Sequence, residues 1–382
     1  MVKTVAFIPL RYGSKGIPMK NIKLIAGKPL CAWVIESACQ SNVFDEIYIS
    51  TDSEAIAKVV QSLGLSVKVI MRPLELATDE ATTESAILHF ANNVDFDVVA
   101  TVQATSPLTE PKDFKNATLL FSRDNLDSLL SGVRIKRFIW DEKGVPLNYN
   151  PVNRPRRQEF KGSILENGAF YLTHRDILMK TKSRLGGVIG IYEMPDETSI
   201  ELDESEDWNI VENLLKEKNK NRNLKKLSKI KLLAMDCDGV LTDGGMYYDK
   251  RGEVIKKFNT RDGKGLELLR EKGILTAIIT GESSKALEYR AEKLKIDHLY
   301  QSVTKKELVL LELMEKYNFK TENIAYVGDD LGDLTAMETA GIKFAVEDAV
   351  NDIKQKADII LTSKGGKCAV REICDLLLET LK

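Results

Sequence analysis

Histidine and cysteine are scarce in this sequence, and a long apolar run is missing. The 382 residues include 3 His and 5 Cys, and no two cysteines form a CxxC pair. This scarcity argues against a disulfide framework, a zinc site and a histidine-based hydrolytic triad. No segment approaches the roughly 18 apolar residues of a membrane span, and the N-terminus lacks the apolar core and cleavage site of a signal peptide. We therefore expect a protein of the reducing cytoplasm with no membrane partner.

An excess of charge of either sign is also missing. The sequence has 55 Lys and Arg against 57 Asp and Glu, which gives a formal net charge of -2. That balance offers no electrostatic reason to bind nucleic acid, so we expect none as a partner. The length exceeds that of a typical single domain, and 43% hydrophobic residues are ordinary for globular proteins. Two globular domains are the expectation.

A polar stretch separates the two halves of the chain. Residues Lys216 to Lys231 are dominated by Lys, Arg and Asn and hold few large apolar side chains. This composition predicts a solvated helix end followed by a linker, and no aromatic residues interleave there to stack nucleic acid bases. We place the domains at residues 1–222 and 223–382.

Short apolar strands alternate with helical patterns in both halves. The expected strands are 46–51, 67–71 and 97–102 in the first half, and 232–235, 275–280, 323–327, 343–346 and 358–361 in the second. The expected helices are 30–41 and 53–63, then 265–272, 285–294, 306–317 and 333–340. Such alternation predicts two doubly wound, mainly parallel-sheet α/β domains of the Rossmann-like kind.

Two aspartates follow the first apolar strand of the second half. Asp236 and Asp238 come directly after Leu232–Met235, and Gly239 then permits a sharp turn. A carboxylate at a strand end can attack phosphorus, and a neighbouring carboxyl can protonate the leaving oxygen. Two carboxylates would repel a phosphate, so the site requires a hard cation. Mg²⁺, which prefers oxygen ligands, is suited to it.

Three more polar groups stand where such a site would need them. Asp329 follows the strand 323–327. If this strand is a parallel neighbour of 232–235, Asp329 comes close to Asp236 and completes the metal site. Thr280 offers a hydroxyl and a backbone N–H to a phosphate oxygen, and Lys306 opens a helix and would neutralise negative charge. The alternative for each aspartate alone is a helix cap or a turn. Their ordered succession favours phosphoryl transfer.

The second half resembles the haloacid dehalogenase superfamily. Its segments DCDGVLTDGGMYYD, TRDGKGLELL, IITGESS and AYVGDDLGDLTAM are similar to those of the capless 3-deoxy-octulosonate-8-phosphate phosphatase group. The resemblance implies that Asp236 is the nucleophile and Asp238 the general acid and base. It implies Mg²⁺ ligation by Asp236, the Asp238 carbonyl and Asp329, with Asp330 and Asp333 supporting the metal from outside. Thr280 and Lys306, rather than Lys305, handle the phosphate.

The same group carries a glycine-rich tail that ends in an arginine. Here the tail reads GGKCAVRE over Gly365–Glu372. In relatives it reaches the active site of a neighbouring subunit, and a hairpin corresponding to Tyr247–Val254 helps to assemble a tetramer. The resemblance therefore implies that Arg371 contacts substrate. A surface arginine paired with Glu372 is the alternative.

A basic, glycine-containing loop follows the first strand of the chain. Residues 8–21 read IPLRYGSKGIPMKN. The groups in this loop that suit a triphosphate are Arg11, Gly13, Ser14, Lys15, Gly16 and Lys20. The loop fits neither the GxxxxGK[ST] pattern nor the GxGxxG pattern of common nucleotide sites. A solvated basic turn is the alternative.

The first half resembles the CMP-sialic acid synthetases (acylneuraminate cytidylyltransferases) and the related CMP-octulosonate synthetases. Further matching segments are STD at 50–52, RP at 72–73, QATSPL at 103–108, RPRRQ at 154–158, ENGA at 166–169 and SIELD at 199–203. The RPRRQ and ENGAFY forms are closer to the animal-type sialic acid enzymes, which also carry a phosphatase-like second domain.

This second resemblance implies specific roles. CTP would be held by Arg11, Gly13, Ser14, Lys15, Lys20, Asn21 and Arg72, with Arg11 and Lys20 also acting in catalysis. The acceptor sugar would contact Gln103, Asn167 and Arg157, the last being one of three candidate arginines with Arg154 and Arg156. Mg²⁺ would be held by Asp203 together with Glu201.

We therefore expect a bifunctional enzyme. One half would transfer CMP from CTP to a nonulosonate, a sialic acid-type 2-keto-3-deoxy sugar acid, with release of pyrophosphate. The other would hydrolyse the sugar-acid phosphate, and both would use Mg²⁺ in a homotetramer built as a dimer of dimers. Two alternatives stay open: an octulosonate pair of reactions, and a second domain that serves only in oligomerisation.

Overall fold

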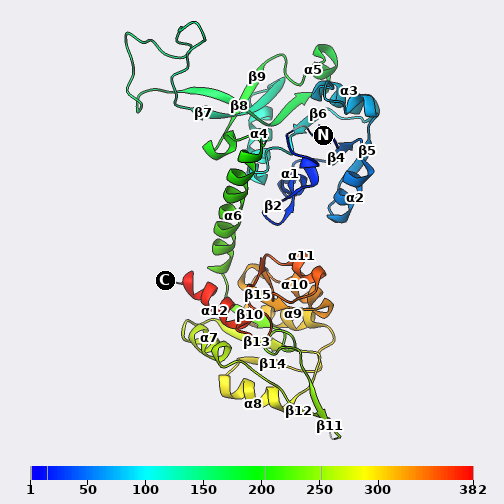
Figure 1. Ribbon diagram of the computed structural model, residues 1–382, viewed down its shortest axis with the longest axis vertical. Coiled ribbons are helices and arrows are strands. Elements are labelled where there is room, and N and C mark those ends of the chain that lie inside the picture. The colour runs from blue at the N-terminus through cyan, green and yellow to red at the C-terminus, as the bar shows by residue number, and fades with distance from the viewer. Residues whose placement is uncertain (1, 15, 203, 251, 382) are drawn as a thin grey trace. The chain divides into compact units, whose positions relative to one another are not determined.

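The computed structural model describes residues 2–14, 16–202, 204–250 and 252–381. The chain divides into two compact units, Met1–Glu217 and Lys218–Lys382. Helix α6 (Ser205–Leu227) runs across this division (Figure 1). The sequence-based boundary between residues 222 and 223 lies inside this helix.

The first unit is built on a seven-stranded sheet in the order β5-β4-β1-β6-β8-β7-β9. Its strands are β1 (Thr4–Leu10), β4 (Glu46–Thr51), β5 (Lys68–Met71), β6 (Val98–Val102), β7 (Ser128–Ile135), β8 (Ser163–His174) and β9 (Ile189–Met194). A small separate hairpin pairs β2 (Leu24–Ile25) with β3 (Lys28–Pro29). The strands β5, β4, β1 and β6 are parallel to one another. The long β8 runs antiparallel to both β6 and β7.

Helices cover both faces of this sheet. They are α1 (Leu30–Ser41), α2 (Glu54–Ser62), α3 (Thr83–Asn93), α4 (Pro111–Arg123), α5 (Arg175–Thr181) and the first part of α6. Apolar residues of α1, α2 and α4 pack on one face, and those of α3 and α5 pack on the other. This arrangement confirms the doubly wound α/β class, because each parallel strand pair needs a crossover helix. The part of the sheet formed by β7, β8 and β9 was not predicted; in it β8 is antiparallel to its neighbours and β9 is parallel to β7.

A segment between β7 and β8 extends away from the sheet of the first unit (Figure 1). Its aromatic side chains make a small cluster of their own, in which the ring centroids of Phe138 and Tyr149 lie 4.1 Å apart. The Arg154 guanidinium lies 4.6 Å from the centroid of the Phe138 ring. One of the three candidate arginines is thus occupied by a cation–π contact.

The second unit is built on a six-stranded, fully parallel sheet in the order β14-β13-β10-β15-β16-β17. Its strands are β10 (Leu232–Met235), β13 (Leu275–Ile279), β14 (His298–Tyr300), β15 (Ile324–Gly328), β16 (Ile342–Ala345) and β17 (Ile359–Ile360). A separate hairpin pairs β11 (Tyr247–Asp249) with β12 (Gly252–Ile255). The helices are α7 (Thr260–Glu271), α8 (Lys285–Leu294), α9 (Lys306–Tyr317), α10 (Leu334–Thr339), α11 (Asn351–Lys356) and α12 (Ala369–Glu379).

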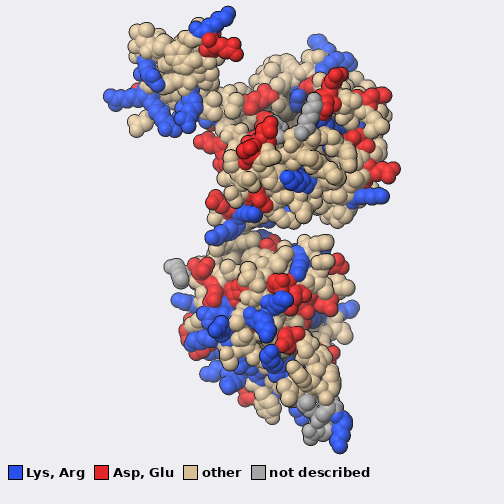
Figure 2. Space-filling model, in the orientation of Figure 1, with Lys and Arg blue, Asp and Glu red and all other residues tan. Residues whose placement is uncertain are grey.

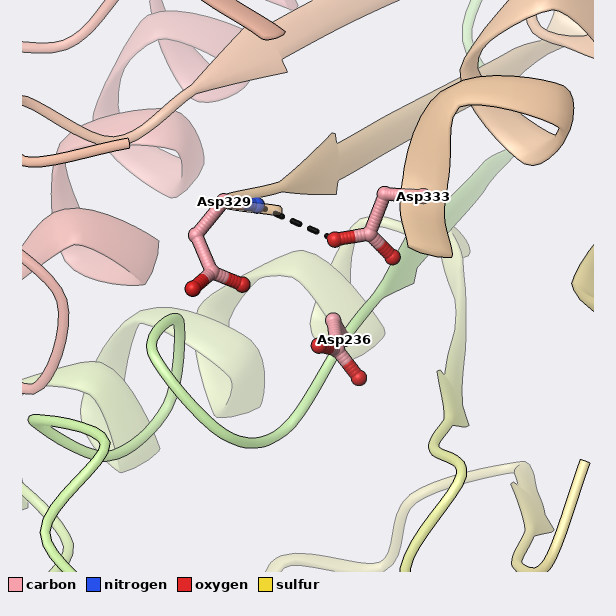
Figure 3. Close-up of side chains that lie close together, drawn as sticks. All are labelled: Asp236, Asp329 and Asp333. Carbon is pink, nitrogen blue, oxygen red and sulfur yellow. Dashed lines mark hydrogen bonds between the residues drawn. The ribbon is translucent and has the colours of Figure 1, made fainter. Parts of the chain in front are cut away.

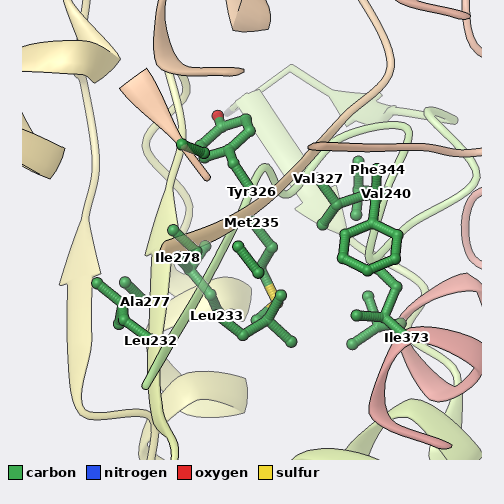
Figure 4. Close-up of a cluster of buried hydrophobic side chains, with 14 of the residues drawn as sticks. Leu232, Leu233, Met235, Val240, Ala277, Ile278, Tyr326, Val327, Phe344 and Ile373 are labelled. Carbon is green, nitrogen blue, oxygen red and sulfur yellow. The ribbon is translucent and has the colours of Figure 1, made fainter. Parts of the chain in front are cut away.

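One large apolar core holds the second unit together (Figure 4). Leu233 and Met235 of β10, Val327 of β15 and Phe344 of β16 are fully buried in it, as is Ile373 of α12. Burial on both faces explains why β10 and β15 read as continuous apolar runs. The core therefore holds these two strands rigidly, and with them the loops at their carboxyl ends.

The expected linker is mostly helical, which corrects the prediction for residues 216–231. Helix α6 continues to Leu227, and only a few residues separate it from β10. Leu224 and Leu227 pack against the core of the second unit, and Lys226 pairs with Asp358 at 2.7 Å. Packing at i and i+3 thus stabilises a segment whose composition alone suggested a solvated tether.

The surface mixes charges of both signs. Figure 2 shows Lys and Arg interspersed with Asp and Glu on the face in view. Within the described residues, no helix is both long and apolar enough to cross a membrane.

Candidate functional site

The carboxyl ends of β10 and β15 bring acidic side chains together in the second unit. Asp236 follows β10, and its backbone N–H donates to the Val327 carbonyl at 3.1 Å. Asp329 follows β15, and Asp333 lies one short turn further on. Figure 3 shows the three carboxylates converging. One oxygen of each lies within 4.8 Å of the others, which is close enough to share a single metal ion.

Lys306 and the aspartates neutralise one another only in part. The Lys306 ammonium lies 2.8 Å from Asp236 and 2.8 Å from Asp333. Burial, with the nearby Asp333 carboxylate, raises the pKa of Asp236 to about 6 against the opposing effect of Lys306. Burial and Asp236 raise the pKa of Asp329 to about 7. Three carboxylates facing one lysine leave an excess of negative charge that a divalent cation would balance.

The hydrogen bonds distinguish Asp333, whose oxygens are engaged by protein groups, from Asp236 and Asp329, which are candidate metal ligands. Asp333 accepts from Lys306 and from the Tyr326 hydroxyl (2.7 Å) on one oxygen, and from the Asp329 N–H (3.0 Å) on the other. Both of its oxygens are therefore engaged. Asp329 Oδ1 is buried without a hydrogen-bond partner among the residues that the structure describes. A buried, unsatisfied carboxylate oxygen beside a second carboxylate fits a cation at Asp236 and Asp329, with Asp333 in support.

Close packing of glycines shapes the loop around Asp236. Gly239 has a φ of +85°, and a Cβ placed there would lie 2.0 Å from Asp329 Oδ2. A Cβ on Gly365 would lie 1.9 Å from the Gly239 carbonyl oxygen, and the Gly366 N–H donates to the Val240 carbonyl at 2.9 Å. The first glycines of the tail thus lie on the loop that follows Asp236 in their own chain. The reach to a neighbouring subunit that the resemblance implies stays a prediction.

Asp238 stands apart from the carboxylate cluster. Its Oδ2 lies 2.7 Å from the ammonium of Lys256, whose side chain is fully buried. The Thr242 hydroxyl donates to its Oδ1 at 3.3 Å. The carboxyl is partly accessible, with 17% of its side chain exposed. This placement is compatible with a proton-exchanging group, while metal ligation through the Asp238 carbonyl stays a prediction.

Thr280 lies at the end of β13 and is buried, as predicted from the strand pattern. Its backbone N–H, however, donates to the Tyr300 carbonyl at 3.0 Å. The prediction that this N–H donates to a phosphate oxygen is wrong, because the N–H already donates to β14. The hydroxyl oxygen of Thr280 accepts from the Glu282 N–H at 3.3 Å and keeps its own hydrogen to donate.

Arg371 lies on α12, where its guanidinium pairs with Asp375 at 2.8 Å. The partner in the alternative interpretation, Glu372, instead accepts from Thr362 and Ser363. The backbone N–H of Arg371 donates to Asp262 Oδ1 at 2.8 Å, so Asp262 caps α12 from a different helix. Within one chain Arg371 is engaged on its own helix, and contact with substrate stays a prediction.

In the first unit, the predicted nucleotide residues line one cavity of about 270 Å³ at the end of β1. Its walls include Arg11, Gly13, Ser14, Lys20, Asn21, Arg72 and Gln103. Predicted residues Lys15 and Asp203 lie outside the described residues. The cavity wall also includes Thr78 and Asp79, to which the sequence analysis assigned no role. Asp79 pairs with Arg11 at 2.9 Å.

Several contacts organise this cavity. The Asn21 side-chain amide donates to the Arg11 carbonyl at 2.8 Å, and the Lys20 ammonium donates to the Leu202 carbonyl at 2.6 Å. Lys20 therefore joins the basic loop to the segment that follows Glu201. Arg72 is buried, its Nε has no hydrogen-bond partner within the described residues, and burial lowers its pKa. A buried guanidinium that lines a cavity is suited to an anionic or carbonyl-bearing ligand.

Only one of the three predicted sugar contacts of this unit lines this cavity. Asn167 is buried; it accepts from the Ser131 hydroxyl at 2.8 Å and donates to the Thr198 carbonyl at 3.2 Å. Sugar binding through this amide would have to break those bonds. Arg157 lines a different cavity of about 520 Å³ with Arg134 and Arg137. Gln103 alone of the three lines the nucleotide cavity.

Glu201 packs beside a glycine turn. Gly168 has a φ of +64°, and a Cβ placed there would lie 2.9 Å from Glu201 Oε1. Glycine at this position therefore lets β8 approach the segment predicted to hold Mg²⁺. Metal ligation by Glu201 itself stays a prediction.

Comparison with known proteins matches successive parts of the chain to two families. Residues 5–240 match the cytidylyltransferase family, and residues 246–347 match the haloacid dehalogenase-like hydrolase family. N-acylneuraminate cytidylyltransferase A of Danio rerio is 35% identical over 98% of this chain and 88% of its own. The N-acylneuraminate cytidylyltransferase of Oncorhynchus mykiss is 32% identical with the same coverage.

Relatives of the second unit alone are bacterial phosphatases. The 3-deoxy-D-manno-octulosonate 8-phosphate phosphatase KdsC of Escherichia coli K12 is 46% identical over 40% of this chain and 81% of its own. The Moraxella catarrhalis enzyme, solved with magnesium, phosphate and KDO, is 41% identical over 42% of this chain and 92% of its own, with a TM-score of 0.41. Since the first family spans more than half of the chain and its relatives align along nearly all of it, this chain belongs to the cytidylyltransferase family and carries a haloacid dehalogenase-like phosphatase domain.

Proposed function

We propose that the chain is a bifunctional enzyme that completes the activation of a nonulosonate. The second unit removes phosphate from the nonulosonate 9-phosphate, and the first unit transfers CMP from CTP to the freed sugar acid with release of pyrophosphate. The observation that carries this proposal is the similarity along almost the whole chain to N-acylneuraminate cytidylyltransferases. The two reactions are consecutive, which gives their fusion a chemical reason.

The phosphatase reaction follows from the groups at the carboxyl end of the second sheet. An oxygen of Asp236 attacks phosphorus, the bond from phosphorus to the sugar oxygen breaks, and Asp238 gives that oxygen a proton. Water then attacks the phosphoaspartate and returns a proton to Asp238, which frees Asp236 and inorganic phosphate. Lys306, 2.8 Å from Asp236, offsets the negative charge that accumulates.

Mg²⁺ is the cation that we propose for both units. Asp236 and Asp329 would hold it in the second unit, together with the Asp238 carbonyl, and Asp203 with Glu201 would hold it in the first. When bound, it would shield phosphate charge and help to orient the phosphoryl group. The unsatisfied Asp329 oxygen supports this choice in the second unit.

In the first unit, the anomeric hydroxyl of the sugar acid attacks the α-phosphorus of CTP and expels pyrophosphate. Arg11, Ser14, Lys15 and Lys20 hold the phosphates in this proposal, and Asn21 with Arg72 contacts the cytidine. Catalysis rests on positioning and on offsetting charge. A homotetramer, the cytoplasm as compartment, and roles for Gln103, Asn167, Arg157 and Arg371 toward the sugar acid belong to the same proposal.

A second candidate is favoured by one observation. The second unit is 46% identical to an octulosonate 8-phosphate phosphatase, which supports an eight-carbon substrate for both reactions. A third, an oligomerisation module without activity, is disfavoured because the Asp236, Lys306 and Asp329 arrangement is intact.

A substrate panel tests these candidates. Pyrophosphate release is measured with CTP and octulosonate, N-acetylneuraminate or its deaminated analogue, and phosphate release is measured with the phosphate ester of each. We expect nonulosonates to be preferred in both assays. Preference for octulosonate in both would favour the second candidate, and absence of phosphate release from every ester would favour the third.

A further inference from the structure

A second buried lysine lies beside the phosphatase site. Lys256 has none of its side chain exposed, and its ammonium lies 2.7 Å from Asp238 Oδ2. An ammonium is costly to remove from water, so a fully buried lysine is retained only where an anionic partner compensates. The Asp238 carboxylate is such a partner.

Lys256 reaches Asp238 from a separate part of the chain. It follows β12 and precedes α7, whose N-cap residue is Asn259. The hydroxyl of Thr242, which is also buried, donates to the other carboxylate oxygen of Asp238 at 3.3 Å. A donor on each oxygen restricts rotation of the carboxyl about its bond to Cβ.

The two buried lysines have different partners. Lys306 contacts Asp236 and Asp333, each at 2.8 Å, whereas Lys256 contacts Asp238. The proposed nucleophile and the proposed acid and base are thus each held by a lysine on a different segment. This separation allows the orientation of Asp238 to be disturbed without touching the nucleophile.

We propose that Lys256 is a positioning residue for Asp238. It holds the carboxyl where it can give a proton to the oxygen that leaves phosphorus, and later take one from the attacking water. The inference rests on the proposed phosphatase function and adds a residue to which neither resemblance assigned a role. Lys256 exchanges no proton itself, so the balance of each step is unchanged.

This role predicts a dependence on the leaving group. A sugar alkoxide is a poor leaving group and needs its proton as the bond to phosphorus breaks, whereas p-nitrophenolate leaves readily without one. A misplaced Asp238 should therefore slow formation of the phosphoaspartate from alkyl phosphates far more than from p-nitrophenyl phosphate. The later attack of water is common to both substrates, so the two are compared by kcat/KM. A lysine that only attracted phosphate would affect both substrates alike.

The experiment uses the full-length chain with Lys256→Met, which removes the ammonium and keeps the length of the side chain. Lys257→Met is the matched control, because Lys257 is the adjacent residue, is exposed and pairs with Asp243 at 3.0 Å. Turnover is measured on the preferred sugar-acid phosphate and on p-nitrophenyl phosphate. Asp238→Asn and the double variant complete a cycle.

We expect Lys256→Met to lower kcat/KM, which reports formation of the phosphoaspartate, at least tenfold on the sugar-acid phosphate and less than threefold on p-nitrophenyl phosphate. In the Asp238→Asn background, Lys256→Met should have no further effect on the sugar-acid phosphate. Equal losses on both substrates, or an added loss in that background, would overturn the inference. Lys256→Gln, which keeps a donor, should give an intermediate loss and supplies the test if the methionine variant does not fold.

Failure of the proposed function gives a different result. In that case the unaltered chain releases no phosphate from any sugar-acid phosphate, whatever the variants do. Melting temperatures of all variants, measured together with pyrophosphate release by the first unit, identify a loss that reflects unfolding.

Discussion

The ammonium of Lys306 lies 2.8 Å from a carboxylate oxygen of Asp236, although 70 residues separate them in the chain. Burial lowers the pKa of Lys306, but Asp236 and Asp333 outweigh it and leave that pKa raised. The lysine therefore stays charged while it faces the proposed nucleophile. A permanent positive charge at this point offsets the negative charge of an incoming phosphate and keeps the carboxylate oriented toward phosphorus.

Gly239→Ala should abolish phosphatase activity by pushing Asp329 aside. The added Cβ would lie 2.0 Å from Asp329 Oδ2, at a φ of +85°. We expect kcat for phosphate release to fall at least ~100-fold, because displacing a catalytic group by about 1 Å can cost that much. Gly273→Ala is the control, since Gly273 also has a positive φ (+78°) but has nothing within 4 Å. If both variants lose activity equally, backbone strain rather than Asp329 is responsible.

Asp329→Asn should weaken the metal site of the second unit. An amide supplies a neutral oxygen in place of the buried carboxylate oxygen, which has no hydrogen-bond partner in the described part of the chain, and Mg²⁺ prefers carboxylates. We expect the Mg²⁺ concentration for half-maximal phosphate release to rise at least ~10-fold. Removal of metal by a chelator should stop both reactions of the unaltered chain, and Mg²⁺ should restore them. An unchanged requirement in the variant would contradict ligation by Asp329.

Arg72→Met should weaken CTP binding. Arg72 is buried in the wall of the nucleotide cavity, and its Nε lacks a protein partner within the described residues. Loss of a hydrogen bond from a charged donor costs about 1.5–3 kcal/mol, or roughly a tenfold to hundredfold rise in KM for CTP. Arg123→Met serves as control because Arg123 is 73% exposed and pairs with Asp124. Phosphate release by the second unit should be unaffected in both variants.

Asp262 makes stability depend on pH. Burial raises the pKa of Asp262 to about 6, above its usual value, so the folded state binds its proton more tightly than the unfolded state does. Its contribution to stability is therefore most favourable below about pH 4 and is lost as pH rises through 6. Asp262→Asn keeps an acceptor for the Arg371 N–H and should stabilise the second unit at pH 7.5 by about 1–3 kcal/mol.

Hydrogen exchange of the α12 amides measures this effect, because all three tryptophans lie in the first unit and cannot report on the second. The gain in protection should be present at pH 7.5. A loss of protection in Asp262→Asn at that pH would mean that the charged carboxylate stabilises the N-terminus of α12 instead.

Much of the second unit follows from its sequence. The apolar runs at β10 and β15 end in aspartates, and parallel strands bring those ends to one edge, so the meeting of Asp236 and Asp329 could be predicted. The pairing of Lys256 with Asp238 could not be predicted. The position of Lys256 depends on the path of the chain after β12, and no periodic sequence pattern encodes that path.

The first unit is less transparent. The expected strands recovered β4, β5 and β6, but β7, β8 and β9 were missed, because the antiparallel pairing of a 12-residue strand has no short turn signal. Composition also misled at α6, where Leu224 and Leu227 pack against the apolar core of the second unit although the surrounding segment is polar. The hydrogen bonds of Asn167 to Ser131 and Thr198 could not be predicted either, because these partners are distant in the sequence from the motif that contains Asn167.

The most direct measurement is chemical trapping of the phosphorylated enzyme. The full chain is mixed with nonulosonate 9-phosphate labelled with ³²P, quenched in acid within milliseconds, and digested for peptide mapping. The account predicts a label on Asp236 that hydroxylamine releases, and none in Asp236→Asn. Rapid phosphate release from the unaltered chain with no label on Asp236 would contradict it.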